Sequence, residues 1–364
     1  MIKFLVYVAI ILTALAIGYL VRVFELASSL KGSKPEVITE KDNRLQARLM
    51  LAFLFAFFAY TIWNLYEFVP KMLPLAASEH GVELDWLFNF NMAIIFFVFF
   101  ITHIALFYFA YKYYGRKGRV ATFLAHDNKL EMIWTIIPAI VLAVIIIFGL
   151  RSWNKITSDA DPNSMVVEIY AKQFDWTARY SGADNKLGNA NYRMITATND
   201  LGMDSTSAEG QDDIVVKNEI HIPVNKEIEM KFRSRDVIHS ALFPHFRAQM
   251  NVVPGMTTMF HFTPTITTTE MRKNPDVIRQ MGEINTIRAA KAKQDGTPFK
   301  AVEFDYILLC NKICGNSHYN MQMTVIVDTE EDYKKWLATK PAFYAKAAAP
   351  AAGESKKAEV AEVK

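Results

Sequence analysis

Residues 133–150 read IWTIIPAIVLAVIIIFGL, an apolar run without a charged side chain. A run of this length approaches the roughly 20 residues that an α-helix needs to cross a bilayer. From Met165 onward the pattern changes to short segments rich in β-branched and aromatic residues, separated by turn residues. The sequence therefore predicts a membrane-spanning helix followed by an all-β domain outside the bilayer.

Three more apolar stretches precede this helix, at residues 4–24, 50–68 and 86–111. We therefore predict a membrane anchor of four helices over residues 1–152. Basic side chains gather around the loop between the first two stretches and the loop between the last two (Arg22, Lys31, Lys34, Lys41, Arg44, Arg48; Lys112, Arg116, Lys117, Arg119, Lys129). Since positively charged loops stay in the cytoplasm, both termini and the β domain should lie outside it. The first stretch could instead be a cleaved signal peptide, but its positive charges mostly follow the apolar run.

The second half of the chain contains five segments with the composition of strands, at residues 166–170, 219–224, 228–233, 257–262 and 324–327. They predict a β-sandwich or barrel of about seven to ten strands over residues 153–338. Two stretches look inserted. Residues 185–213 are polar and contain three glycines, and residues 269–296 are charged, with a helix expected from Asn274 or Asp276. The tail, residues 339–364, is rich in Ala, Lys and Glu, and we expect it to be disordered.

The composition excludes several classes of protein. The net charge of +3 over 364 residues, without a basic helix or a nucleic-acid motif, gives no reason to expect nucleic-acid binding. Only two cysteines occur, Cys310 and Cys314. That number excludes a disulfide-rich scaffold and the attachment of a c-type haem, so we expect no haem in this chain.

Two thiols, an imidazole and a thioether fall within twelve residues, in the run Cys310-Asn311-Lys312-Ile313-Cys314-Gly315-Asn316-Ser317-His318-Tyr319-Asn320-Met321. Sulfur and imidazole ligands favour copper, whereas Met is a poor ligand for zinc. His239 lies about seventy residues earlier, and loops at one end of a sandwich can bring it to the same site. A mononuclear blue-copper site uses one Cys, so two thiols indicate a binuclear electron-transfer centre. On the cysteines alone a disulfide would be favoured, since the compartment outside the cytoplasm is oxidising, and zinc is a minor alternative.

Three motifs make the chain similar to subunit II of cytochrome c oxidase over roughly residues 124–328, apart from the two insertions. Residues 131–138 (EMIWTIIP) resemble the start of that family's last transmembrane helix. Residues 236–240 (DVIHS), followed by Pro244 and residues 253–255 (VPG), resemble its first copper loop. Residues 310–321 resemble its second copper loop and are the most specific of the three. The family usually has two transmembrane helices, so the chain resembles a bacterial type with two additional N-terminal helices.

By this resemblance, the extramembrane fold is a cupredoxin-like Greek-key sandwich with a binuclear copper centre, CuA. The ligands it implies are Cys310 and Cys314 as bridges, His239 with Met321 on one ion, and His318 with the backbone carbonyl of Lys312 on the other. Electrons would arrive from cytochrome c, or a cytochrome c domain, and leave to haem a in subunit I, where O₂ is reduced to water and protons are pumped. Glu131 would lie at the cytoplasmic entrance of a proton path into subunit I.

The resemblance also implies a place and partners. The chain would lie in the bacterial inner membrane, with its copper domain on the periplasmic side. Subunits I and III of the oxidase would be its partners, and an alternative complex III is a further candidate. Five carboxylates and no basic residue occur between Asp200 and Asp213, and such a patch could attract a cationic cytochrome c.

Two features depart from the family pattern. The family usually has Glu between the two cysteines, where its side chain binds magnesium, but this chain has Lys312. An ammonium group cannot bind Mg²⁺, so we expect no magnesium ligand from this subunit. The family's tryptophan-rich stretch for electron entry here contains Phe174 in place of the first tryptophan, followed by Trp176. Phe174 and Trp176 are therefore the candidates for electron entry.

Other functions compete with this interpretation. A quinol oxidase subunit II keeps the fold and the anchor but lacks the copper ligands, which are all present here. A membrane-anchored copper carrier or assembly factor needs an open, exchangeable site, whereas five side-chain ligands suit a permanent subunit. Nitrous and nitric oxide reductases can bear the same copper centre, but the Glu131 motif and the lack of a large catalytic domain favour the oxygen-reducing complex.

Overall fold

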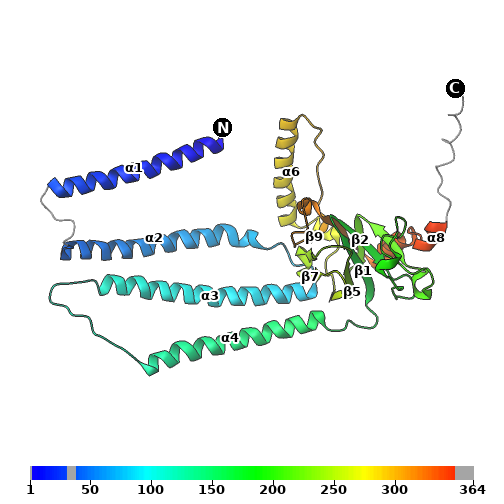
Figure 1. The fold of residues 1–364 in the computed structure, drawn as a ribbon, viewed down its shortest axis with the longest axis horizontal. Helices are drawn as coiled ribbons and strands as arrows, with labels where there is room; N and C mark the ends of the chain where they lie inside the picture. The colour runs from blue at the N-terminus through cyan, green and yellow to red at the C-terminus, as the bar shows by residue number, and fades with distance from the viewer. Residues whose placement is uncertain (1, 31–37, 349–364) are drawn as a thin grey trace. The chain divides into compact units, whose positions relative to one another are not determined.

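The computed structural model describes residues 2–30 and 38–348. Within these residues four helices are long and apolar enough to cross a membrane: α1 (Ile2–Leu30), α2 (Glu40–Met72), α3 (Glu79–Lys112) and α4 (Asn128–Thr157) (Figure 1). The predicted four-helix anchor is confirmed. Each helix is longer than predicted because it continues beyond its apolar core into flanking polar residues. The fourth helix, for example, begins before Glu131 and continues past Lys155.

Phenylalanine rings pack α2 against α3. The rings of Phe53 and Phe107 lie 5.6 Å apart, and those of Phe57 and Phe99 lie 5.8 Å apart. The ring of His103 belongs to this layer, at 5.6 Å from the ring of Phe57, and its Nδ1 contacts the backbone carbonyl of Phe99 at 2.8 Å. The imidazole is thus satisfied by the preceding turn of its own helix.

Ten strands in the described part of the chain form two five-stranded sheets, with the orders β3-β2-β1-β5-β8 and β4-β10-β9-β6-β7. The strands are β1 (Met165–Lys172), β2 (Asp175–Tyr180), β3 (Ile214–Lys217), β4 (Glu219–Pro223), β5 (Ile228–Ser234), β6 (His239–Phe243), β7 (Ala248–Val252), β8 (Thr258–Phe262), β9 (Tyr306–Cys310) and β10 (Gln322–Asp328). All five predicted strand segments are strands, and the predicted sandwich is confirmed.

The register of the strands explains both the core and the position of the loops. Alternate residues of β5 are buried, and Phe232 from this strand packs in one core with Ile169 of β1 and Ile222 of β4. Each such apolar side chain contributes about 1.5–3 kcal/mol by leaving water. Since β9 pairs antiparallel with both β6 and β10, the end of β9 lies beside the starts of β6 and β10. One end of this sheet therefore collects loops that are far apart in the sequence.

The loop between α2 and α3 is part of the β domain. Residues Leu73–Asn91 belong to the same compact unit as the sheets. The backbone N–H of Ala77 donates to the carbonyl of His245 at 2.7 Å, and the carbonyl of Ala77 accepts from the N–H of Thr265 at 2.9 Å. The guanidinium of Arg247 donates to both carboxylate oxygens of Asp85, at 2.7 and 2.9 Å. The backbone hydrogen bonds of Ala77 attach the loop to two different segments of the domain, and the Arg247–Asp85 ion pair reinforces them.

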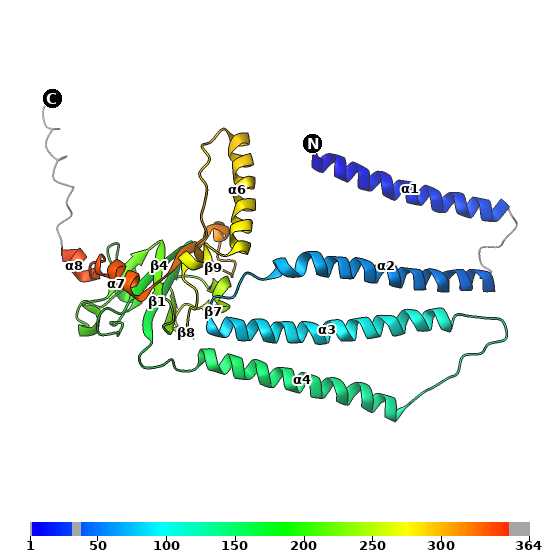
Figure 2. The ribbon, with the colours of Figure 1, turned by 180° about the vertical axis from the view of Figure 1, so that it is seen from behind.

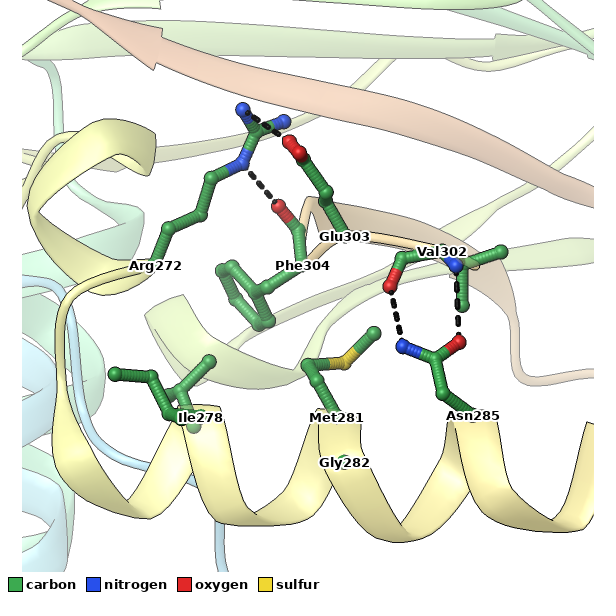
Figure 3. Close-up of a pocket in the computed structure, with 9 residues that line it drawn as sticks. Arg272, Ile278, Met281, Gly282, Asn285, Val302, Glu303 and Phe304 are labelled. Atoms are coloured by element: carbon green, nitrogen blue, oxygen red, sulfur yellow. Dashed lines mark hydrogen bonds and ion pairs between the residues drawn. The ribbon is translucent and has the colours of Figure 1, made fainter. Parts of the chain in front are cut away.

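Both predicted insertions are ordered. In residues 185–213 the chain forms two short 3₁₀ turns, Tyr192–Met194 and Ala208–Gly210. In the second insertion, α5 (Thr268–Met271) is followed by α6 (Pro275–Asp295), which is capped by Asn274 and ends at Gly296 with φ of 67°. The side chain of Asn285 in α6 makes two hydrogen bonds with the backbone of Val302, at 2.9 and 3.0 Å, and so ties the returning segment to the helix (Figure 3).

The C-terminal tail differs from the prediction of disorder. Helix α7 (Glu330–Ala338) lies beside β4 and is followed by α8 (Phe343–Ala348) (Figure 2). Phe343 and Tyr344 pack against a small buried cluster of Tyr170, Leu201 and Met203, and the N–H of Phe343 donates to the carbonyl of Asp213 at 2.7 Å. Disorder was therefore the wrong prediction for residues 343–348, because two aromatic side chains anchor the segment. Residues 349–364 of the predicted tail lie outside the described residues.

Candidate metal centre

Three strand ends position the residues that the sequence singled out as metal ligands. His239 is the first residue of β6, Cys310 is the last residue of β9, and Ala241 of β6 pairs directly with Cys310. The loop from β9 to β10 then carries Cys314, a 3₁₀ turn that begins at His318, and Met321. Antiparallel pairing of these strands brings the segment with His239 to the loop with the two cysteines.

The donor atoms of these side chains converge around the two sulfur atoms. The Sγ atoms of Cys310 and Cys314 lie 3.9 Å apart. His239 Nδ1 lies 3.8 Å from the first sulfur, and His318 Nδ1 lies 3.6 Å from the second. Met321 Sδ lies 3.6 Å from the sulfur of Cys314, and the carbonyl oxygen of Lys312 lies 3.2 Å from the sulfur of Cys310. The six residues that offer donor atoms are therefore His239, Cys310, Lys312, Cys314, His318 and Met321.

The donor set fits a metal ion. A metal–thiolate bond is about 2.3 Å long, as for zinc, so two sulfurs up to about 4.6 Å apart can contact one ion. The observed 3.9 Å lies within that limit and far beyond a disulfide bond of about 2.05 Å. Both cysteines are free and buried. The arrangement of His239, Cys310 and Cys314 keeps their donor atoms within 4.8 Å of one another, as a shared ion requires.

Burial makes this set of donors dependent on a cation. His239 is fully buried, and Cys314 and Met321 are nearly so. Burial, reinforced by the neighbouring Cys310, raises the pKa of the Cys314 thiol to about 11. Without a cation the Cys314 thiol therefore keeps its proton at neutral pH, and a metal ion must displace that proton when it binds.

Asp236 orients the buried imidazole. Its Oδ1 accepts a hydrogen bond from His239 Nε2 at 2.9 Å and another from the N–H of Val237 at 2.7 Å. With Nε2 engaged, Nδ1 is the nitrogen that faces the sulfurs. A carboxylate behind a histidine is a common way to fix the tautomer of a metal ligand. The sequence motif contained Asp236, but nothing in the sequence alone indicated this contact.

The two candidates for electron entry occupy different environments. Trp176 is 1% exposed, its Nε1 lies 3.5 Å from the carbonyl of Met321, and its ring lies 6.0 Å from the ring of His239. The side chain of Trp176 is therefore enclosed in the core beside the donor cluster, and its role in electron entry stays a prediction. Phe174 lies in the turn between β1 and β2 and is only partly buried, so its ring remains accessible.

The remaining candidates lie away from the donor cluster. Glu131 is an exposed residue in the first turn of α4. His221 contacts Asp328, and His261 contacts Glu227 at 2.7 Å, so both have carboxylate partners. The pocket in Figure 3, of about 410 Å³, lies between α6 and residues 302–304. Its lining contains no cysteine or histidine, and its carboxylate, Glu303, is paired with Arg272 at 2.9 Å.

The predicted acidic patch is partly neutralised. Asp200 pairs with Lys172, Arg235 and Lys217. Asp213 is fully buried and paired with Arg179. Three of the five carboxylates, Asp204, Glu209 and Asp212, remain without such a cationic partner among the described ion pairs. The patch is thus smaller than the sequence suggested.

Comparisons with known proteins agree on one family. The family model described as the transmembrane domain of cytochrome c oxidase subunit II matches residues 50–152, and the model for the periplasmic domain matches residues 165–269. The first match begins within α2, so α1 lies outside it.

Among curated relatives, the alternative cytochrome c oxidase subunit 2 of Bradyrhizobium diazoefficiens is 30% identical over 278 residues, which cover 76% of this chain and 86% of the relative. The cytochrome c oxidase subunit 2 of Cereibacter sphaeroides is 23% identical over 282 residues, covering 74% and 78%. Among solved structures, the periplasmic domain of subunit II of cytochrome oxidase from Bradyrhizobium japonicum covers 50% of this chain and 95% of that chain, with 19% identity and a TM-score of 0.29.

Proposed function

This chain belongs to the cytochrome c oxidase subunit II family, and we propose that it is the electron-transfer subunit of a haem–copper oxidase with a binuclear copper centre. One observation carries the proposal, namely the convergence of two buried thiols, two imidazoles, a thioether and a backbone carbonyl at one end of the sandwich. Sulfur and imidazole donors select copper, and two thiols indicate two ions.

In this proposal Cys310, Cys314, His239, His318, Met321 and the backbone carbonyl of Lys312 would hold the two copper ions. The ions would supply single-electron transfer with little change of geometry. The protein contributes a rigid, nearly dry set of ligands, with His239 held by Asp236.

The route of electrons and protons follows from the family. We propose that cytochrome c delivers electrons near Phe174, a partly exposed aromatic residue that lies against Gly315 in the cysteine loop. From the centre electrons pass to haem a in subunit I, where O₂ is reduced to water and protons are pumped, with subunit III in the same complex. Glu131, exposed at the start of α4, would admit protons from the cytoplasm. The membrane is the bacterial inner membrane, with the copper domain in the periplasm.

The segment between the cysteines supports a further part of this proposal. Lys312 offers its carbonyl to the centre, while its side chain is exposed. Its ammonium group cannot replace the carboxylate with which the family usually binds magnesium. We therefore propose that this subunit supplies no ligand to Mg²⁺.

The test is to express the full chain with copper, purify it in detergent, and record its copper content and electron paramagnetic resonance spectrum. We expect two copper ions per chain and a hyperfine pattern from two equivalent copper nuclei. Cys314→Ser and His318→Gln should lose the pattern, while His126→Gln, a change at an exposed loop residue, should keep it. One copper with a mononuclear spectrum, or a Cys310–Cys314 disulfide without copper, would refute the proposal.

A chelator added to the same purified chain distinguishes a copper carrier from a permanent subunit. A carrier must release its ion, whereas Cys314 and Met321 are 4% and 1% exposed. We expect a chelator to remove copper from the native chain only slowly at neutral pH, and faster in acid, where protons compete with the metal for its ligands. Rapid exchange at neutral pH would favour the carrier.

A further inference from the structure

The turn between β1 and β2 has an unusual backbone. The two strands pair as far as Lys172 and Asp175, so Gln173 and Phe174 alone form the turn. Phe174 has φ of +84°, in the left-handed region that normally requires Gly or Asn at this position of a turn. A large side chain in such a conformation is strained, and surrounding contacts must hold it there.

Those contacts come from the loop that carries the cysteines. Gly315, the residue after Cys314, has φ of +141°, and a Cβ atom placed there would lie 2.9 Å from Cζ of Phe174 and 3.0 Å from Nε2 of Gln173. The turn therefore lies directly against the backbone of Gly315. Another residue here would force both side chains to shift, and its backbone would be strained at this φ, so the position favours glycine.

Gln173 also connects the two ligand segments through hydrogen bonds. Its side-chain Nε2–H donates to the carbonyl of Cys314 at 2.6 Å. Its backbone N–H donates to Oδ2 of Asp236 at 2.7 Å, and the other oxygen of that carboxylate holds His239. Gln173 thus contacts Cys314 directly and His239 through the carboxylate of Asp236.

We propose that Gln173 is a positioning residue of the metal centre, which holds Cys314 in place and raises the reduction potential of the bound metal. The inference rests on the proposed function, since it concerns the same donors. The amide hydrogen points at the Cys314 carbonyl and so brings partial positive charge to the backbone of a ligand residue. Positive charge nearby favours the reduced centre, because the reduced centre has one positive charge less. The strained turn at Phe174 fixes the direction of this dipole.

The first test uses changes of Gln173 in the full chain, expressed with copper and purified in detergent. Gln173→Met keeps the length of the side chain and removes its donor, so the reduction potential should fall. We expect the one-electron equilibrium to shift about three- to tenfold, where tenfold corresponds to about 59 mV. Gln173→Lys keeps a donor and adds positive charge, so the potential should not fall. Gln280→Met, on the exposed surface of α6, controls for the chemical change itself.

Each outcome of this test either supports or overturns the positioning role of Gln173. A lower potential or a loss of copper with Met, but not with Lys, supports the positioning role. Equal potentials and equal electron paramagnetic resonance spectra for native chain and Gln173→Met overturn it while leaving the copper centre intact. Loss of copper in both Gln173 variants also overturns it, because the donor would then not be the determining feature. A native chain without a binuclear centre removes the proposed function itself, and this inference with it.

A second test addresses the close contact at Gly315. Gly315→Ala should push the turn away, so that copper is lost to a chelator faster than from the native chain. Gly296→Ala is the matched control, because Gly296 also has positive φ (67°) and an added Cβ there meets nothing within 4 Å. Equal rates of copper loss for Gly315→Ala and the native chain would show that the contact does not hold the loop.

Discussion

Arg179 connects the first insertion to the sandwich through a buried network of charges. Its side chain is 2% exposed, lies 3.4 Å from a carboxylate oxygen of Glu168, and pairs with Asp213, whose side chain is fully buried. A second nitrogen donates to the carbonyl of Gly188 at 2.5 Å. A charge at this depth is tolerated only with such partners, because burial without them is costly.

We therefore expect Arg179→Met to destabilise the domain by about 3–5 kcal/mol, since it leaves the carboxylate of Asp213 buried without its cation, whereas Glu168 keeps Arg233. A denaturant titration of the full chain, followed by tryptophan fluorescence, would measure the change. Arg279→Met, at an exposed position on α6, should change stability by less than about 0.5 kcal/mol. Equal midpoints for the two variants would contradict the role assigned to the network.

Asp200 gives the protein a pH-dependent contribution to stability. Burial alone would raise the pKa of its carboxyl, but the hydrogen bond and charge of Lys172, with Arg235 and Lys217, bring the pKa below its ordinary value of 3.8. A lowered folded-state pKa means that the stabilisation is present above pH 3.8 and is lost as pH falls through the folded-state value. We expect Asp200→Asn to cost about 1 kcal/mol at pH 7 and nothing at strongly acidic pH. A cost that persists in acid would show that the effect is not electrostatic.

At the residue scale, the metal ligands could be predicted from the sequence, but the residues that hold those ligands in place could not. Cysteine, histidine and methionine are recognisable by identity, and Cys310 to Met321 lie close together in the chain. Gln173 and Cys314 are 141 residues apart, and their contact depends on the pairing of strands that the sequence does not specify. The positive φ of Phe174 is likewise held by tertiary contacts, which override local preference.

At the scale of elements, strands and helices followed from their periodicity, whereas the attachment of the α2–α3 loop did not. This loop contains no strand pattern. Its short pairing with the domain uses the backbone of Ala77 and Ser78, which any sequence offers. The tail shows a similar limit, because an Ala- and Lys-rich composition concealed Phe343 and Tyr344, whose burial orders α8.

Arg247 is the side chain that should hold the α2–α3 loop on the domain. It donates to Asp85, to the carbonyl of Pro74 at 2.5 Å and to that of Pro244 at 2.6 Å. We expect Arg247→Ala to weaken this attachment by about 1–2 kcal/mol, so that hydrogen exchange at the amides of Ala77 and Thr265 becomes about 5- to 30-fold faster. The amide of Ile222 in the core should be unaffected, and so should all three amides in Arg272→Ala. Unchanged exchange at Ala77 would show that the backbone contacts suffice.

At the scale of the whole molecule, the charge pattern sets the orientation of the membrane helices. Two loops rich in Lys and Arg alternate with the α2–α3 loop, and the β domain follows an even number of spans. The α2–α3 loop is bound to the β domain, so these two parts must lie on the same side of the membrane. This contact agrees, independently of charge, with two membrane spans, α3 and α4, between the loop and the domain.

The orientation can be tested with single cysteines in a chain that also carries Cys310→Ser and Cys314→Ser. Asp159→Cys lies just after α4, and Ala121→Cys lies in the basic loop between α3 and α4; both positions are exposed. Since basic loops are retained in the cytoplasm, a membrane-impermeant maleimide should label Asp159→Cys in intact cells and Ala121→Cys only after permeabilisation. The reverse pattern would place the donor cluster in the cytoplasm, where a cytochrome c in the periplasm could not reach it. Labelling of both positions in intact cells would instead show that α4 does not cross the membrane.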